Sequence, residues 1–151
     1  MTAPIYPAPG EFPDFEQFML DLFTPIGTTV TSLPAAGDQI TATLPFLWVR
    51  TVGGTLDGNE VTYIAKVRVV ALGHTRTEAQ RLAGRAREAM LDAPATRVNG
   101  VLIDWAEEAI PAEVKYFPPT VQRSQGVADL PNLDPLGQMV EIGFTLHARR
   151  Q

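Results

Sequence analysis

The side chains that most often carry out catalysis are scarce in this sequence. It contains two histidines, His74 and His147, two serines, Ser32 and Ser124, and no cysteine. A metal site needs several convergent ligands, and the two histidines are not at a spacing that would place them on one face of a helix. Neither serine lies in the strand–turn–helix motif that exposes a nucleophilic serine. The absence of cysteine excludes thiolate zinc sites, cysteine nucleophiles and disulfides.

Two further patterns could serve chemistry. Asp104, Glu107 and Glu108 are close in sequence, and paired carboxylates can act as general acid and base. Alternation along the strand expected there puts Asp104 on the opposite face from Trp105, which favours a solvated sheet edge for the carboxylates. The pair Gly53-Gly54 lacks the lysine and the helix of a phosphate-binding loop, and we interpret it as a hairpin tip. We therefore predict no catalytic residues, no cofactor site and no metal site.

Length and composition are those of one soluble domain. The chain has 151 residues, of which 45% are hydrophobic and 19% charged, with a formal net charge of −5. The longest basic run is Arg149-Arg150, so the clustered cations with which proteins hold nucleic acid are missing. No apolar stretch approaches the roughly 20 residues that cross a bilayer, and the first residues do not resemble a signal peptide. We expect no membrane contact.

Residues 1–13 are predicted to form an extended arm that precedes a single domain over residues 14–151. Four prolines in this segment fix φ and remove backbone donors, which disfavours a helix. Tyr6 and Phe12 are large apolar residues for a solvated tail, and they indicate docking onto this subunit or a neighbour. A frayed terminus is the alternative interpretation.

Two helices are predicted. Asp14 is placed as an N-cap before apolar residues at helical spacing, and Pro25 and Gly27 end this first helix. The second helix begins with a capping box of Thr75 and Glu78. Its apolar face consists of Ala79, Leu82, Ala83, Ala86, Ala89 and Met90. Gly84 lies on the opposite face, where a glycine is either tolerated or permits close approach by another subunit.

Strands are predicted over residues 28–33, 46–52, 61–72, 101–106 and 138–148. A turn containing Gly53, Gly54, Asp57 and Gly58 joins the second of these strands to the third, which is long enough for the hairpin to project. Prolines interrupt the chain after residue 110, and residues 120–135 form a long loop. The element order predicts an α+β fold, with an antiparallel or mixed β-sheet, two helices packed on one face, a projecting β-hairpin and long loops.

Three segments give the chain a family resemblance. Leu44-Pro45 precedes an apolar strand that ends with Arg50 and the pair Gly53-Gly54; the long third strand leads through Gly73-His74-Thr75 into an alanine-lined helix; and the last strand ends in Thr145-Leu146-His147-Ala148-Arg149. In these segments, over about residues 14–150, the chain resembles the tail terminator proteins of long-tailed, non-contractile bacteriophages. The proline-rich start and the 120–135 stretch go beyond the family pattern.

The resemblance implies a structural virion protein of the tail–neck region, assembled in the cytoplasm of the host bacterium. Such proteins form a ring, commonly a homohexamer, that caps the tail tube, ends its polymerisation and provides the head–tail joining surface. The partners implied are further copies of the chain, the major tail tube protein and a head-closure or neck protein. DNA would pass through the lumen without specific binding, and an acidic protein suits such a wall.

Ring closure requires a head-to-tail interface between subunits. The candidate contacts lie in the arm, the hairpin, the outer face of the second helix and the late loop, at Tyr6, Phe12, Gly53, Gly54, Asp57, Gly58, Gly84, Arg123, Gln125, Leu130 and Leu133. Two alternatives stay open. One is another phage neck or minor tail connector protein, and the other is a small α+β metabolite-binding domain or enzyme, which the sparse histidine, serine and cysteine inventory disfavours.

Overall fold

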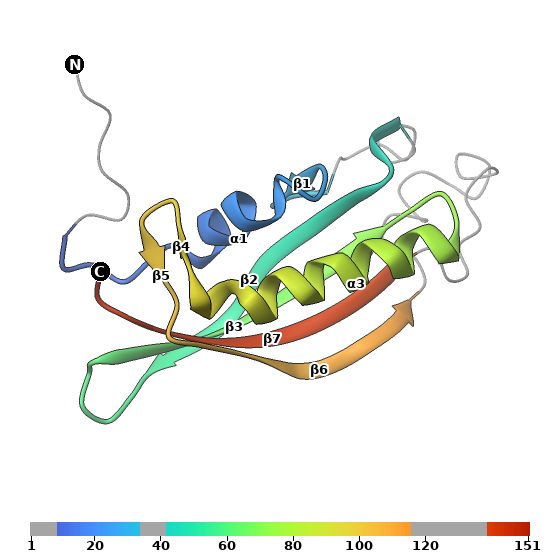
Figure 1. The fold of residues 1–151 in the computed structure, drawn as a ribbon. Helices are drawn as coiled ribbons and strands as arrows, with labels where there is room; N and C mark the ends of the chain where they lie inside the picture. The colour runs from blue at the N-terminus through green and yellow to red at the C-terminus, as the bar shows by residue number, and fades with distance from the viewer. Residues whose placement is uncertain (1–8, 34–41, 116–138) are drawn as a thin grey trace, which may run out of the picture.

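The second helix and the sheet beneath it dominate the architecture (Figure 1). The computed structural model describes residues 9–33, 42–115 and 139–151. Within these ranges five strands form a mixed sheet in the order β1-β2-β3-β7-β6, in which only the β1–β2 pair is parallel. The elements are α1 (Phe15–Phe23), β1 (Thr29–Val30), β2 (Phe46–Leu56), β3 (Thr62–Leu72), α3 (Arg76–Asp92), the 3-10 helix η1 (Ala93–Ala95), β4 (Arg97–Val98), β5 (Val101–Leu102), β6 (Trp105–Lys115) and β7 (Met139–Arg149). The predicted α+β class is confirmed.

The main core lies between the sheet and the two helices. Alternate residues of the three central strands point to the helical side, and on β7 these are the buried residues Val140, Ile142, Phe144 and Leu146. The helices contribute the apolar residues Phe15, Phe18, Met19, Phe23, Ala79, Leu82, Ala83, Ala86 and Met90. Both amphipathic faces were predicted from helical spacing.

Both helix starts follow the sequence signals, with one difference. The Asp14 carboxylate accepts hydrogen bonds from the backbone N–H groups of Glu16 and Gln17, as an N-cap should. Thr75 Oγ1 accepts from the Glu78 N–H at 3.2 Å, which is one half of the predicted capping box. The other half is shifted, since the Glu78 carboxylate accepts from the backbone N–H of His74 at 2.8 Å. The box therefore spans the turn one residue earlier.

The predicted hairpin tip at Gly53-Gly54 was wrong. Strand β2 continues through both glycines to Leu56, with a register shift between Thr51 and Gly53 that leaves Val52 as an extra residue. The turn is formed by residues 57–61, where the Asp57 carboxylate accepts hydrogen bonds from the N–H groups of Val61 and Thr62 at 2.8 and 3.2 Å. Asp57 and Gly58 therefore belong to the tip, whereas Gly53 and Gly54 belong to strand β2.

The predicted strand over residues 101–106 was also wrong. Strand β5 ends at Leu102, and β6 begins at Trp105, so the buried Ile103 and the 56% exposed Trp105 do not share one face. Strand β6 then passes through Pro111, which was expected to interrupt the chain. Within the described residues β6 pairs only with β7, and a proline is tolerated on an edge strand because it need not donate to the ladder. Register shifts follow Glu108 and Ile110.

The remaining predictions on chain organisation have mixed outcomes. The strand predicted at residues 28–33 is reduced to β1, and the predicted late loop lies outside the described residues. The β2–β3 hairpin extends beyond the helical layer, as expected (Figure 1). A second apolar cluster, which the sequence analysis did not anticipate, lies on the opposite side of the sheet and contains Leu44, Phe46, Val70, Leu72 and Met139.

Candidate interaction surface

The side chains first considered for chemistry each have a separate structural partner. Asp104 pairs with Arg149, Glu108 with Arg87, and Glu107 accepts from the Trp105 indole, so the three carboxylates do not converge. His74 Nδ1 lies 3.0 Å from Glu78 Oε1. The pKa of Glu78 is lowered, chiefly by the hydrogen bond from the His74 backbone N–H. The residues that the structure describes contain no cluster of three or more histidine or carboxylate side chains that could hold a metal.

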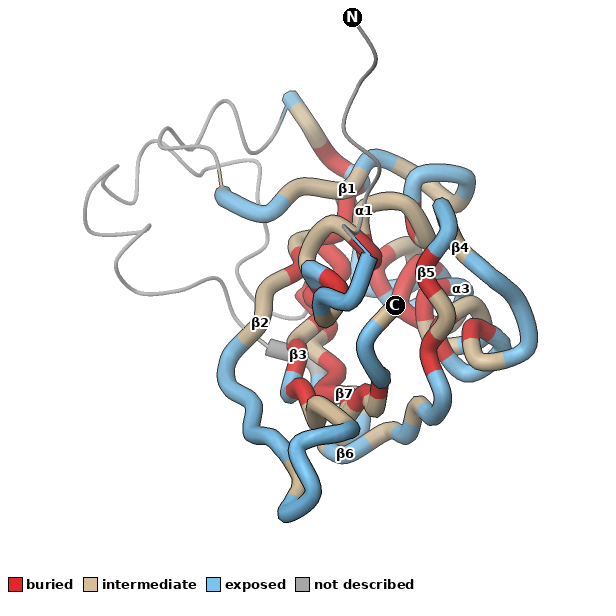
Figure 2. The backbone as a smooth tube through the Cα atoms, turned by 90° about the vertical axis from the view of Figure 1, so that its left-hand side faces the viewer, coloured by how far each residue is buried: buried red, intermediate tan, exposed pale blue. Residues whose placement is uncertain are grey.

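The β2–β3 hairpin carries exposed apolar side chains near its end and at the bulge in β2. Leu56 and Val61, 40% and 50% exposed, flank the turn, and Val52, 47% exposed, lies further back at the bulge in β2; neither of the described helices covers the hairpin end (Figure 2). Gly58 has open space around its Cα. Exposed apolar residues gathered at one protrusion are typical of a surface that another protein covers.

The two glycines before the tip have different environments. A Cβ at Gly54 would meet the Tyr63 ring, with 2.4 Å to its hydroxyl oxygen, whereas a Cβ at Gly53 would have nothing within 4 Å. A side chain at Gly54 would therefore have to displace the Tyr63 ring. Gly53 is exposed and is not constrained by any neighbour in the described structure.

The described end of the N-terminal arm docks onto its own subunit. Phe12 lies 5.7 Å from the Tyr63 ring, measured between centroids, and the guanidinium of Arg150 lies 4.4 Å from the centre of the Phe12 ring. Backbone hydrogen bonds run from Gly10 N–H to the Gln151 carbonyl and from Gln151 N–H to the Glu11 carbonyl. The sequence left open whether the arm docks onto its own subunit or onto a neighbour. These contacts place Phe12 on its own subunit.

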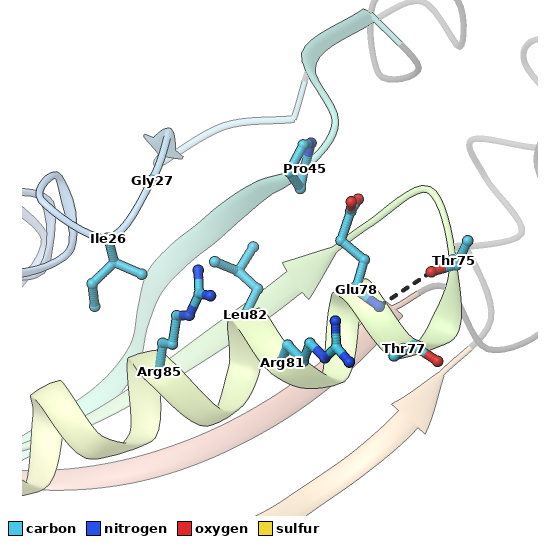
Figure 3. Close-up of a pocket in the computed structure, with 9 residues that line it drawn as sticks. All are labelled: Ile26, Gly27, Pro45, Thr75, Thr77, Glu78, Arg81, Leu82 and Arg85. Carbon is cyan, nitrogen blue, oxygen red and sulfur yellow. Dashed lines mark hydrogen bonds between the residues drawn. The ribbon is translucent and has the colours of Figure 1, made fainter.

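A groove lies between the first half of α3, the loop after α1 and the residue that precedes β2 (Figure 3). Its volume is about 390 Å³, and its lining residues are Ile26, Gly27, Pro45, Thr75, Thr77, Glu78, Arg81, Leu82 and Arg85. Arg81 and Arg85 are exposed and form no ion pair within the described part of the chain. Such a groove combines an apolar floor with two available positive charges.

The groove continues as a shallower depression past Gly84, which is lined also by Glu88 and Ala89. A Cβ at Gly84 would meet nothing within 4 Å, so packing inside the subunit does not require this glycine. Gly84 was predicted from the sequence as a contact residue, whereas the groove was not predicted. The available signal was the pair of arginines one helical turn apart on the outer face of the helix.

The sequence-predicted contact residues are thus not all in one place. Asp57 and Gly58 lie at the hairpin tip, Gly53 and Gly54 in the strand beside it, Gly84 on α3, and Phe12 against Tyr63. Tyr6, Arg123, Gln125, Leu130 and Leu133 lie outside the described residues. Among the helices that are described, none is long and apolar enough to cross a membrane.

Comparison with known protein families identifies a match. The sequence model of a family described as phage tail termination protein matches residues 11–110 of the 151, which is more than half of the chain. The matched range runs from the docked end of the arm through both helices and the hairpin into β6. No curated protein matches the chain significantly.

Proposed function

The chain belongs to the phage tail termination protein family, and from that premise we propose that it forms a ring that caps the tail tube. The ring ends tube polymerisation and provides the surface to which the head is joined. The family match over residues 11–110 carries this proposal, because it includes both helices and the complete β2–β3 hairpin. The role is structural and involves no catalysis.

A closed ring needs an interface in which one surface of a subunit meets a different surface of the next. The exposed hairpin end, with Leu56 and Val61, supports such a contact because it is apolar and is not covered by the described part of this subunit. We keep the arm, Gly84 and the late-loop residues as further candidate contacts. A ring of six is the number that the family resemblance suggests.

The remaining parts of the proposal concern partners and location. One face of the ring would bind the end of the tail tube and the other a head-closure or neck protein, in the tail–neck region of a long-tailed, non-contractile virion. Assembly would occur in the host cytoplasm. DNA would cross the lumen without specific binding, in agreement with the net charge of −5, since a wall without clustered cations does not hold phosphates.

Tube polymerisation in the presence of the purified chain tests this function. The tube protein of the same phage is allowed to elongate with increasing amounts of the chain, and tube lengths are measured by electron microscopy. A cap acts at tube ends, so we expect shortening that saturates at a small molar ratio of chain to tube protein, with extra density at one end. A requirement for equimolar chain would instead indicate sequestration of tube subunits, and unchanged lengths would contradict the proposal.

The same sample separates the two alternative functions. A neck connector would bind finished tails and leave the length of growing tubes unchanged. A metabolite-binding domain would leave tubes unaffected and would gain thermal stability from a small molecule, because a ligand that binds only the folded state raises the melting temperature.

A further inference from the structure

The hairpin tip and the α3 groove have complementary chemistry. The tip, residues 56–61, presents the exposed apolar side chains of Leu56 and Val61 together with the acidic residues Asp57 and Glu60. The groove presents apolar Ile26, Pro45 and Leu82 beside Arg81 and Arg85, which form no ion pair with the described residues. Arginine and carboxylate form strong charge-assisted pairs when apolar surroundings reduce their contact with water.

The two surfaces cannot meet within one chain. Pro45 lines the groove immediately before β2 begins, and Leu56 ends the same strand at the tip. An extended strand of 11 residues spans roughly 35 Å, and the tip and the N-terminal half of α3 lie at opposite ends of the molecule (Figure 1). A contact between them therefore requires a second copy.

We propose that the hairpin tip of one copy seats in the α3 groove of the next, with the Glu60 carboxylate facing Arg81 and Arg85. The interface is head-to-tail, so its repetition generates a closed ring when the rotation between copies closes. This inference rests on the proposed ring and identifies the contact that joins its subunits. It assigns the groove, which the sequence analysis did not anticipate, to the neighbouring subunit.

The backbone at Glu60 supports a binding role for this residue. Glu60 has φ of +58°, in the left-handed region that glycine and asparagine adopt more readily. Its N–H donates to the Asp57 carbonyl at 3.1 Å, but its side chain forms no hydrogen bond or ion pair with the described residues. Residues held in such a conformation occur often at functional sites.

The groove has a size and an electrostatic balance that suit a turn. Its volume of about 390 Å³ is within the range of small-ligand pockets, about 300–1,000 Å³, so it is large enough for a few side chains. The Glu78 carboxylate also lines the groove, but it already accepts a hydrogen bond from the His74 backbone N–H and lies 3.0 Å from His74 Nδ1. Two guanidinium groups against one carboxylate leave the groove positive, which favours an acidic occupant.

Disulfide cross-linking tests the contact directly, because the chain contains no cysteine. The double variant Glu60→Cys with Arg81→Cys carries one thiol on each proposed partner surface. We expect oxidation of the assembled protein to give a ladder of covalent multimers that ends at the closed ring and disappears on reduction. The matched control, Asp92→Cys with Arg81→Cys, places its second thiol on exposed Asp92 at the opposite end of α3 and should give no ladder.

Charge exchange tests the same contact in solution. Either Glu60→Lys or the pair Arg81→Glu and Arg85→Glu should raise the concentration needed for half-assembly roughly tenfold, since like charges would then face each other. A mixture of the two variants should assemble again, because each tip then meets a groove of opposite charge in an alternating ring. The exposed control variants Arg76→Glu and Asp92→Lys should assemble as the parent chain does.

The outcomes separate this inference from the proposed function. If rings form and cap tubes but give no cross-link and no charge dependence, the tip–groove contact is wrong and the proposed function stands. If the arginine variants still form rings but no longer cap tubes, the groove binds the tube protein, and the inference is overturned. If the parent chain neither assembles nor caps, with or without tubes, the proposed function fails and the inference falls with it.

Discussion

The Tyr63 ring lies directly over Gly54, so closely that a Cβ at Gly54 would come within 2.4 Å of the tyrosine hydroxyl oxygen. Phe12 and Phe15 also pack against this ring, each with 5.7 Å between ring centroids. This stack joins the hairpin, the first helix and the described end of the arm. Packing against Tyr63 therefore constrains Gly54, whereas no neighbour constrains Gly53 in the described structure.

Replacement of Gly54 by alanine should therefore destabilise the fold. The added methyl group would have to displace the Tyr63 ring, and overpacking of this kind costs about 1–3 kcal/mol. Gly53→Ala is the matched control, because nothing lies within 4 Å of its Cβ position, and its effect should stay within about 0.5 kcal/mol. Urea unfolding of both variants measures the difference, and equal stabilities would contradict the packing role of Gly54.

Replacement of Gly84 by alanine should stabilise the fold, in contrast to Gly54→Ala. Gly84 lies inside α3 with open space around its Cα, and alanine in a helix interior is more stable than glycine by roughly 0.5–1 kcal/mol. We expect a higher free energy of unfolding, and unchanged assembly in light scattering would remove Gly84 from the candidate contacts. A more stable chain that no longer assembles would instead reveal that a neighbouring subunit approaches Gly84 closely.

The Glu78 carboxylate should make the stability of the chain depend on pH. Its pKa is lowered from 4.5 in the folded chain, mainly because it accepts the His74 N–H. A lowered folded pKa means that the carboxylate stabilises the fold above its unfolded pKa and that this contribution disappears as pH falls through the folded pKa. Glu78→Gln should therefore lower the melting temperature at pH 7, and the two curves should converge below about pH 4. A constant difference at all pH values would contradict this role.

Local signals predicted the helices well because their causes are local. Asp14 and Thr75 cap the helices through hydrogen bonds to residues two or three positions ahead, and helical spacing marks the buried face of each helix. The turn was harder, since both Gly53-Gly54 and Asp57-Gly58 are good turn sequences. The choice between them depends on the pairing of β2 with β3 over the full length of the hairpin. The turn propensities of single residues do not describe this pairing.

The errors at β5 and β6 and the missed groove have a non-local origin. The chain changes direction at Asp104, whose N–H donates to the His147 carbonyl at 2.8 Å, a partner 43 residues later. Alternation alone continues the strand through this point and places Trp105 inside. The groove joins Ile26, Pro45 and Arg81, which come from three separate segments, so no single motif could have indicated it.

The N-terminal arm should divide into two functional parts, and truncation can separate them. Removal of residues 1–13 eliminates the Phe12–Tyr63 contact, the position of Phe12 under Arg150 and the backbone hydrogen bonds to Gln151. Loss of a large partly buried aromatic side chain costs up to about 3 kcal/mol, so this variant should melt at a lower temperature.

Removal of residues 1–8 alone leaves all of these contacts in place, so this shorter truncation should melt as the parent chain does. If the arm also contacts a neighbouring subunit through Tyr6, the shorter truncation should weaken ring assembly without changing stability, because Tyr6 is removed while Phe12 remains. Melting curves combined with light scattering measure both properties on the same samples. Parent-like assembly of the shorter variant would remove Tyr6 from the interface and leave the arm with the stabilising role of Phe12 alone.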